Sequence, residues 1–313
     1  MRQTPHISGV WNNIEFTLAP VRECDYVIIL NRVPEDTEVF CPPENIWAIM
    51  QEPPVGEYEW LQLGYDKFSR IITPDTSLNG PRFVHDSLAL PWHINKSYDE
   101  LVNLERPADK PKFISWITSN KDNRRGHQQR IKFLNAMQGQ LGFDLFGRGF
   151  NAIEDKFSGI YPYKYTLAVE NFSGNFYWTE KLSDCFLAWS MPIYYGCTNI
   201  DAYFPKESYI SIDISKPEEA AEIIKQAVNE CLWEKHLDAI EYSRNLVLHN
   251  YQFFPYIANK ILEDMALPHP GAKSPIELKG LPYMYPAPPA ESVPRNITKK
   301  IKSALAKVGM AKW

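Results

Sequence analysis

The sequence predicts an α/β protein made of two domains, and three observations lead to this prediction. The 313 residues, of which 44% are hydrophobic, are enough for two ordinary domains with sizeable cores. The stretch 161–196 has the pattern strand, loop, helix, strand, which is a βαβ unit with parallel pairing. The polar stretch 100–112 contains Pro107 and Pro111 and is expected to link the domains. The expected boundaries are therefore 1–105 and 106–265.

Short apolar runs predict the strands of the first domain, at 26–30, 46–50 and 68–73. The polar stretch 31–43 is expected to be a connection, 58–63 a short helix and 89–94 extended chain. His93 in that chain is interpreted as a loop or core histidine rather than a functional one. The second strand ends at Gln51-Glu52-Pro53-Pro54, because two prolines end any strand ladder. Glu52 is thus expected just beyond the carboxyl end of a strand, on a stiff loop.

The second domain is expected to alternate strands and helices around the central βαβ unit. Outside that unit, strands are expected at 113–118, 143–146 and 208–214. Helices are expected at 127–138, 217–228, 232–248 and 250–262. Pro217 followed by two glutamates is typical of a helix start. The aromatic residues of the last helix are expected to lie across both domains.

The central βαβ unit carries the polar residues that suggest a site. Its strands are expected at 166–169 and 193–195, and its helix follows Thr179, a good N-cap residue. The helix has apolar residues at i, i+3, i+4 and i+7, namely Leu182, Cys185, Phe186 and Trp189. Ligands bind at the carboxyl ends of such strands. The polar residues expected there are Glu170, Asn171, Tyr177, Glu180 and Lys181. A helix N-terminus with a lysine suits a phosphate, and the carboxylates could hold sugar hydroxyls.

Three segments of this unit resemble family-10 glycosyltransferases, the α-1,3/1,4-fucosyltransferases. They are Val169-Glu170-Asn171, Tyr177-Trp178-Thr179-Glu180-Lys181 and Met191-Pro192-Ile193-Tyr194-Tyr195-Gly196. Val169 stands where the family often has phenylalanine. The resemblance implies a GT-B fold, in which two Rossmann-like domains face each other across a cleft. It also implies inverting transfer of fucose from GDP-fucose to a hydroxyl of a glycan acceptor, without a metal or other cofactor. The chain has no Asp-x-Asp motif, which agrees with a metal-independent mechanism.

The resemblance also implies roles for the polar residues of the donor site. Lys181 and a loop arginine would bind the pyrophosphate of the donor. Glu180 would contact fucose, ribose or the positive charge developing on the sugar, and Tyr177 would contact the nucleotide. In the family the arginine follows a strand ending in Ser-Asn, which Ser119-Asn120 matches. Spacing leaves Arg124 or Arg125 as the counterpart, with Arg125 preferred. Arg130 within the helix is a third candidate, and a solvated basic loop is the alternative.

The resemblance places the general base in the other domain, as a glutamate in a Gly-Glu-Asn segment after a strand. Gln51-Glu52-Pro53 occupies the matching place, with Gln for Gly and Pro for Asn. Glu52 is therefore the candidate base, and Glu57 and Glu59 are the second choices. For all three, a surface carboxylate without a catalytic role is the alternative.

Two other functions fit the same sequence. The scaffold could use a different nucleotide sugar, because the pocket that recognises the sugar is not visible in the sequence. It could also be a non-catalytic glycan- or nucleotide-binding protein, although Glu180 and Lys181 argue against that. The net charge of −5 argues against a nucleic-acid binder.

Composition and the chain ends suggest where the protein works. Five cysteines without a C-x-x-C pair are interpreted as free thiols in a reducing compartment. The N-terminus lacks the apolar segment of a signal peptide, and no apolar run is long enough to span a membrane. Eukaryotic members of the resembled family are usually Golgi proteins with an N-terminal anchor, so the resemblance implies a cytoplasmic bacterial enzyme, or a trimmed piece of a longer protein.

The C-terminal part of the sequence differs in composition from the rest. Residues 266–295 are rich in proline, and no regular element is expected there. Residues 296–313 have lysines and no acidic residue, with apolar residues at helical spacing. Such a basic amphipathic helix is typical of peripheral contact with an anionic membrane, here the inner face. A solvated or crystal-packed tail is the alternative. The resemblance favours the membrane, because bacterial fucosyltransferases of this family can carry basic amphipathic C-terminal tails.

Overall fold

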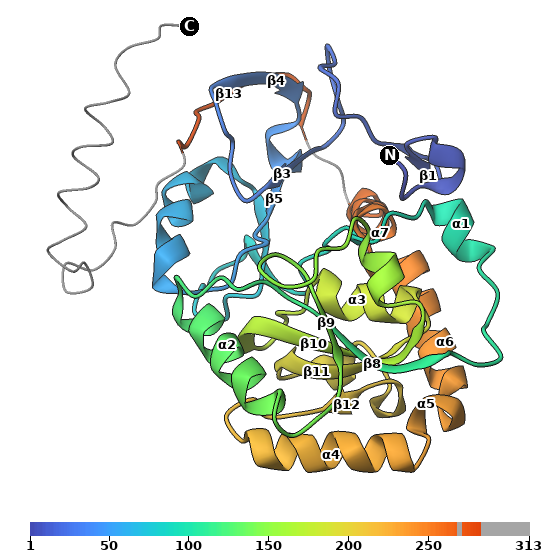
Figure 1. Ribbon diagram of the computed structural model, residues 1–313. Coiled ribbons are helices and arrows are strands. Elements are labelled where there is room, and N and C mark those ends of the chain that lie inside the picture. Colours follow the sequence, from blue (N-terminus) through green and yellow to red (C-terminus); the bar gives the residue numbers. More distant parts are fainter. Residues whose placement is uncertain (268–270, 283–313) are drawn as a thin grey trace, which may run out of the picture.

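The computed structural model describes residues 1–267 and 271–282 and contains two α/β units, each built on a parallel sheet (Figure 1). One sheet has four strands and comes from the first third of the chain, and the other has five strands and comes from the middle. The two units have the Rossmann-like character of a GT-B fold, which confirms the predicted fold class. No helix in the described residues is long and apolar enough to cross a membrane.

The first sheet is parallel and buried on both faces. Its order is β3 (Val27–Leu30), β5 (Ile46–Ile49), β6 (Arg70–Thr73) and β7 (Phe83–His85). Every residue of β5 is buried, as expected for a strand covered on both sides. Ala48 packs with Ile71 and Phe68 on one face, whereas Trp47 and Ile49 pack on the other. The 3-10 helix Gly56–Lys67 follows β5.

The second sheet is also parallel, and its strand order contains a reversal. The order is β12 (Ile210–Ser211), β11 (Met191–Cys197), β10 (Tyr163–Gly174), β8 (Lys112–Ile117) and β9 (Asp144–Phe146). From β8 the chain goes first to β9 on one side and then to β10 on the other. The boundary between β8 and β10 is therefore the topological switch point, where ligands bind in open α/β sheets.

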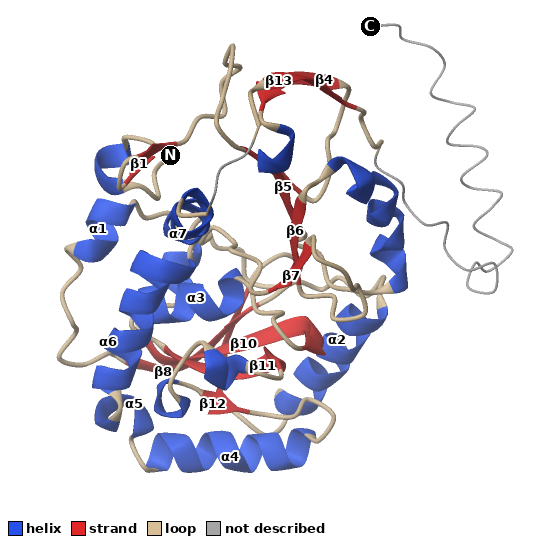
Figure 2. Cartoon of the chain, turned by 180° about the vertical axis from the view of Figure 1, so that it is seen from behind, coloured by secondary structure: helices blue, strands red, loops and turns tan. Residues whose placement is uncertain are grey.

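Helices cover both faces of the second sheet. They are α2 (Arg125–Met137), α3 (Glu180–Leu187), α4 (Pro217–Asn229), α5 (Leu232–Lys235) and α6 (Leu237–Leu246). Helices α3 and α6 lie on one face, and α2 and α4 lie on the other (Figure 2). The remaining short elements are α1 (Tyr98–Val102), β1 (Val10–Trp11), β2 (Ile14–Glu15), the π-turn Val247–Tyr251 and the 3-10 turns Pro5–Ile7, Pro43–Asn45, Lys156–Gly159, Ile200–Ala202 and Lys206–Ser208.

The end of the chain returns to the first sheet, which differs from the prediction. Helix α7 (Phe253–Met265) packs Tyr256, Ile257 and Ile261 against the face that carries Trp47 and Ile49. The sequence had assigned this segment to the second domain. The aromatics of the expected helix 250–262 do lie across both domains, as expected, because the Tyr251 ring contacts Trp178 of the second domain whereas Tyr256 packs on the first sheet.

Strand β13 (Ser274–Leu278) pairs antiparallel with β4 (Thr37–Cys41), and Leu278 is buried. Two expectations were therefore wrong: that 266–295 has no regular element, and that 31–43 is only a connection. Each strand needs the other as its partner, so neither has a strong local signal. The basic segment 296–313 lies outside the described residues.

Candidate functional site

A pocket of about 410 Å³ opens at the switch point of the second sheet. We call it the switch-point pocket. It lies beyond the ends of β8 and β9 and beside the first turn of α3. The polar and charged residues that line it include His93, Ser119, Arg130, Arg148, Lys156, Glu180 and Lys181. Glu180 and Lys181 therefore lie at the ligand-binding end of the sheet, as the sequence predicted.

Glu170, a residue of β10, holds Lys181 of this pocket in place. Its Oε1 accepts hydrogen bonds from the Thr179 backbone N–H at 2.9 Å and the Thr179 hydroxyl at 2.7 Å. Its Oε2 accepts one from Lys181 Nζ at 3.0 Å. The Glu170 side chain is 0% exposed, so it has no surface left for the direct donor contact that the sequence suggested. Glu170 instead orients Lys181 and the start of α3.

A missing side chain at Gly196 makes room for this carboxylate. A Cβ atom at Gly196 would lie 2.5 Å from Glu170 Cγ and 2.6 Å from the Tyr194 hydroxyl. Real Cβ atoms do not approach other atoms so closely, so only glycine fits here. The glycine that ends the predicted Pro-containing strand is thus explained by Glu170 on the neighbouring strand.

Helix α3 begins as predicted, and its first turn holds a network of charges. The Thr179 hydroxyl caps the helix by accepting from the Lys181 backbone N–H. Glu180 Oε1 lies 3.4 Å from Lys156 Nζ, 3.6 Å from His93 Nδ1 and 3.7 Å from Lys181 Nζ. Burial disfavours the ionised form of Glu180, but these three neighbours outweigh it and hold its pKa below the ordinary value. Glu180 is therefore a carboxylate at neutral pH.

Lys181 stays charged because carboxylates surround it. Burial disfavours its charge, but Glu170 and Glu180 together raise its pKa above the ordinary value. Lys156 also forms an ion pair with the buried Asp184 at 3.2 Å, and Asp184 accepts a hydrogen bond from the His93 backbone N–H at 2.9 Å. The sequence analysis gave no role to Lys156 or Asp184, and it treated His93 as an ordinary loop or core residue. No local motif marks them, because they come from separate segments.

The three arginine candidates occupy different places. Arg124 lies over the ring of Tyr58 in the first domain, 4.7 Å from the ring centroid, and donates a hydrogen bond to its hydroxyl. Arg125, the preferred candidate, is exposed and does not line the switch-point pocket. Arg130 does line it, although its side chain is largely buried. Its Nε has no hydrogen-bond partner among the described residues.

The preference for Arg125 is therefore not supported, and a periodicity explains why Arg130 faces the pocket. Arg130, Phe133, Leu134 and Met137 are the buried residues of α2. They are spaced i, i+3, i+4 and i+7, so Arg130 begins the face that packs on the sheet. The sequence contained this signal, but Arg130 was ranked third because it lies within the helix.

Arg148 reaches the same pocket on a Gly-Arg-Gly turn. Gly147 and Gly149 have φ angles of +115° and +87°, which favour glycine. A Cβ atom at Gly147 would lie 1.9 Å from the Thr118 carbonyl oxygen. The turn thus packs directly on the end of β8 and brings Arg148 to the pocket wall.

Asn171 and Tyr177, two further predicted donor-binding residues, do not line the switch-point pocket. The Tyr177 hydroxyl donates to Asn171 Oδ1 at 3.0 Å. Burial, with smaller effects from Glu170, Glu52 and Glu180, raises the pKa of Tyr177 well above its ordinary value. This pair braces the loop between β10 and α3.

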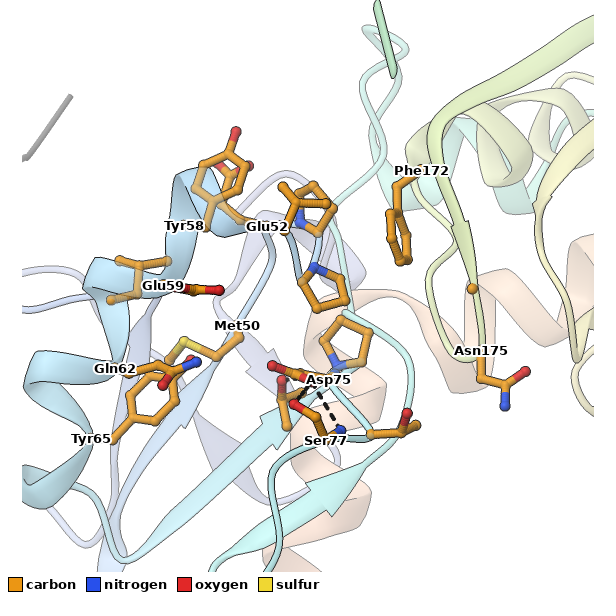
Figure 3. A pocket seen from close by; sticks show the side chains of 18 residues that line it. Met50, Glu52, Tyr58, Glu59, Gln62, Tyr65, Asp75, Ser77, Phe172 and Asn175 are labelled. Atoms are coloured by element: carbon orange, nitrogen blue, oxygen red, sulfur yellow. Dashed lines mark hydrogen bonds between the residues drawn. The ribbon is translucent and has the colours of Figure 1, made fainter. Parts of the chain in front are cut away.

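A second pocket, of about 360 Å³, lies between the two domains (Figure 3). We call it the interdomain pocket. The first domain lines it with residues that follow β5 and β6 and with the 3-10 helix, and the second domain contributes Phe172, Gly174 and Asn175. Glu52 and Glu59 line this pocket, and Glu57 does not. Burial raises the pKa of Glu52, and the nearby Arg124 partly opposes this.

No group of three His, Cys, Asp or Glu side chains within residues 1–267 and 271–282 is arranged to hold a metal ion. The lysines and arginines that line the switch-point pocket are Arg130, Arg148, Lys156 and Lys181, and Arg124 lies next to the interdomain pocket, over the ring of Tyr58.

Comparisons with known proteins agree with this arrangement. Residues 107–243 match the family model described as glycosyltransferase family 10 (fucosyltransferase) C-term. The chain is similar to 4-galactosyl-N-acetylglucosaminide 3-alpha-L-fucosyltransferase 9 of mouse, at 31% identity over 123 residues, covering 37% of this chain and 33% of the relative. It is also similar to the alpha-(1,3)-fucosyltransferase FucT of Helicobacter pylori, at 27% identity over 150 residues, covering 45% and 31%. The matches thus span about a third of these relatives.

Two solved structures align with part of the chain. A crystal structure of an alpha1,3-fucosyltransferase with GDP aligns with a TM-score of 0.44 and 19% identity, over 67% of this chain and 75% of that chain. The crystal structure of TarM aligns with a TM-score of 0.45 and 10% identity, over 71% and 50%.

Proposed function

Residues 107–243 belong to glycosyltransferase family 10, and from this premise we propose that the chain transfers fucose from GDP-fucose to a hydroxyl of a glycan acceptor, with inversion at the anomeric carbon. The observation that carries the proposal is the first turn of α3, where Glu170 and Glu180 hold Lys181 charged beside the switch-point pocket.

The switch-point pocket suits a nucleoside diphosphate. Lys181 Nζ and Arg130 Nε supply positive charge, and the N-terminus of α3 supplies backbone N–H groups and a favourable dipole. The diphosphate gains negative charge as it leaves the sugar, so cations fixed in advance stabilise the transition state more than the bound donor. Glu180 would accept a hydrogen bond from a ribose or fucose hydroxyl, or stabilise the positive charge that develops on the sugar ring.

Glu52 is the group that we assign as the general base. Inversion requires a base that takes the acceptor proton on the face opposite the leaving diphosphate. Glu52 lies on the first domain, in the wall of the interdomain pocket, and its electrostatic influence reaches Tyr177 beside the donor site. Burial raises its pKa above that of an exposed glutamate, which makes its carboxylate the more basic of the two.

The donor assignment can be tested by binding and turnover. We expect GDP-fucose to saturate the protein and to be hydrolysed slowly without an acceptor, and GDP-mannose and UDP-sugars to do neither. Lys181→Ala should weaken GDP binding by about tenfold to a hundredfold, the usual effect of losing a hydrogen bond to a charged group. Hydrolysis of a UDP-sugar in preference to GDP-fucose would assign the scaffold to another donor. Binding of GDP-fucose without hydrolysis or transfer would indicate a non-catalytic protein.

We further propose that the reaction needs no metal ion, because Lys181 and Arg130 neutralise the leaving group. Transfer from GDP-fucose to galactosyl-N-acetylglucosamine, the acceptor named for the mouse relative, should be unchanged after treatment with EDTA. Activity that is lost with EDTA and regained with Mn²⁺ or Mg²⁺ would contradict this mechanism.

A further inference from the structure

The interdomain pocket is shaped to hold a sugar ring beside Glu52. Figure 3 shows Tyr58, Glu59 and Tyr65 on the side of the 3-10 helix and Phe172 on the opposite side. Aromatic rings and prolines offer apolar faces to the C–H groups of a sugar, whereas Gln62 and Asn175 offer hydrogen bonds to its hydroxyls. The pocket is therefore amphipathic in the way that a carbohydrate is.

Phe172 is fixed in place before any ligand binds. A Cβ atom at Gly174 would lie 2.6 Å from the Phe172 ring, so this ring occupies the space of the missing side chain. The ring also contacts Tyr177 edge-on, with centroids 5.3 Å apart. A rigid aromatic wall costs little entropy when a ligand packs on it.

The charges of this pocket all have one sign. Three of its 18 lining residues are carboxylates, Glu52, Glu59 and Asp75, and none is a lysine, arginine or histidine. No ion pair to these three carboxylates is found among the described residues. Asp75 Oδ1 accepts hydrogen bonds from the Ser77 hydroxyl at 2.6 Å and from the Ser77 backbone N–H at 3.0 Å, so neutral donors are its partners.

The nearby Arg124 offsets part of this negative charge, since it partly opposes the rise in the pKa of Glu52. Three carboxylates beside one cation still leave the pocket with a net negative charge. The Arg124 guanidinium is held over the Tyr58 ring, and Arg124 is not among the lining residues. Burial and the Asp75 charge raise the pKa of Tyr65 to about 12, so its hydroxyl remains a neutral donor. A negative group on a ligand would meet three like charges in a partly buried site, where screening by solvent is weak.

We propose that the interdomain pocket is the acceptor site and that it selects uncharged glycans, rejecting those that carry a carboxylate, sulfate or phosphate on the sugars next to the reacting hydroxyl. This inference rests on the proposed function and adds the chemical class of the acceptor to it. The selection comes from repulsion of anionic acceptors. It should therefore appear as a lower kcat/KM for a charged acceptor than for its neutral form, rather than as tight binding of the neutral form.

The test compares acceptors that differ only in charge. Galactosyl-N-acetylglucosamine and a panel of other neutral oligosaccharides are each paired with their sialylated and sulfated forms, and kcat/KM is measured with GDP-fucose. We expect the neutral member of each productive pair to be preferred by about tenfold or more, the effect of a poorly screened like charge. Equal use of both members, or preference for the anionic one, would overturn the inference.

Charge reversal at the pocket wall makes the test specific. Glu59→Lys should raise the ratio of kcat/KM for anionic over neutral acceptors by about tenfold, because one repulsive charge becomes attractive. Asp66→Lys is the control, since Asp66 is an exposed residue of the same 3-10 helix that does not line the pocket. Thermal unfolding of both variants checks that the fold is kept. A ratio that moves equally in both variants, or in neither, would refute the pocket as the origin of selectivity.

Failure of the inference is separable from failure of the proposed function. GDP-fucose binding and hydrolysis are measured on the same preparations. If the donor is used but no acceptor of either charge is fucosylated, the acceptor-site inference fails and the donor site stands. If the donor itself is neither bound nor hydrolysed, the proposed function fails.

Discussion

At the scale of single residues, the site depends on carboxylates with opposite tasks. Glu170 is fully buried and holds Lys181 at 3.0 Å, so its task is to keep a cation charged and in place. Glu52 has no ion pair among the described residues and lies in a pocket wall, which leaves its oxygens for a proton. Burial raises the pKa of both groups. Lys181 opposes this rise at Glu170, and Arg124 opposes it at Glu52. Under the proposed function, the environment of each carboxylate rather than its residue type gives the two groups different roles.

Glu52→Gln should leave GDP binding intact and lower transfer by about a hundredfold or more, the usual scale for loss of a general base. In the parent protein, activity should fall as the pH drops through the raised pKa of Glu52, because the base becomes protonated. This acidic limb should vanish in the variant, and a pH profile of kcat/KM checks it. If Glu59→Gln removes the limb and Glu52→Gln does not, the other carboxylate of the pocket is the base.

The contribution of Glu52 to folding stability should change with pH in the opposite direction to activity. Since the pKa of Glu52 is raised by folding, its ionisation stabilises the unfolded state more than the folded state. The contribution of Glu52 to stability is thus fully present below its unfolded pKa and is lost as the pH rises through the folded pKa. Glu52→Gln should therefore have a higher Tm than the parent at pH 7 and an equal or lower one at pH 4. A lower Tm at both pH values would show that Glu52 makes a structural contact.

Arg130→Ala should weaken GDP binding by about tenfold or more, whereas Arg125→Ala should change it little. The reason is that Arg130 lines the switch-point pocket and Arg125 is exposed outside it. Titration of both variants with GDP measures the difference. Arg130→Lys separates charge from shape, because a lysine restores the charge but not the planar guanidinium. Equal loss in Arg125→Ala would restore the original preference for that residue.

At the scale of elements, the unit β10, α3 and β11 works because two strands and a helix start meet around one carboxylate. Glu170 comes from β10, Thr179 caps α3, and Gly196 of β11 leaves the space that Glu170 fills. The sequence signals for these elements are local: a cap residue, a helical period and an apolar strand. The sequence therefore predicted this unit well, although β10 continues to Gly174, beyond the expected end of the strand.

Gly196→Ala should impair both stability and donor binding, because its Cβ would collide with Glu170 and displace it from Lys181. We expect a loss of about 1–3 kcal/mol in unfolding free energy, as for overpacking in a core, together with weaker GDP binding. Gly139→Ala is the control, since no atom lies within 4 Å of a Cβ placed there. Chemical denaturation and GDP titration measure the two effects. An unchanged GDP affinity would mean that Glu170 does not position Lys181.

Elements that depend on distant partners were not predictable in the same way. Strand β13 begins 237 positions after the start of β4, and within the described residues the two strands pair only with each other. Lys156 meets Glu180 and Asp184 only when a 3-10 turn lies beside α3. The short turn and the edge strands have no periodicity long enough to recognise. Arg130 differs, because the helical period that places it on the packed face of α2 can be read from the sequence.

At the scale of the whole molecule, the last described segments complete the first domain. Helix α7 covers one face of the first sheet, and β13 pairs with β4 on the other side of that domain. Asp86 joins the parts, since it accepts hydrogen bonds from Tyr203 of the second domain at 3.1 Å and from Tyr256 of α7 at 2.8 Å. The relation of the two pockets therefore depends on contacts made by the end of the chain.

A chain that ends at Leu267 should be less stable than one that ends at Pro282, by about 1–3 kcal/mol. The first lacks β13, so it leaves β4 unpaired and removes the buried Leu278 from the core of the first domain. Both chains lack 283–313, so the comparison measures the contribution of 268–282, in which β13 is the regular element. Thermal and urea unfolding measure the loss. Equal stabilities would show that β13 contributes nothing to the domain.

The return of α7 has a consequence for how the protein is made. During synthesis, the first 105 residues leave the ribosome long before α7 (253–265). Trp47, Ile49 and Ile72, which α7 covers in the folded protein, therefore stay exposed to solvent while the second domain is made. The first domain can therefore reach its final form only after the second one, and a gene fragment that encodes 1–105 alone would yield an insoluble product. Dividing this protein into independently folding halves requires α7 to be joined to the first half by a new connection, so that the order of its elements along the chain is changed.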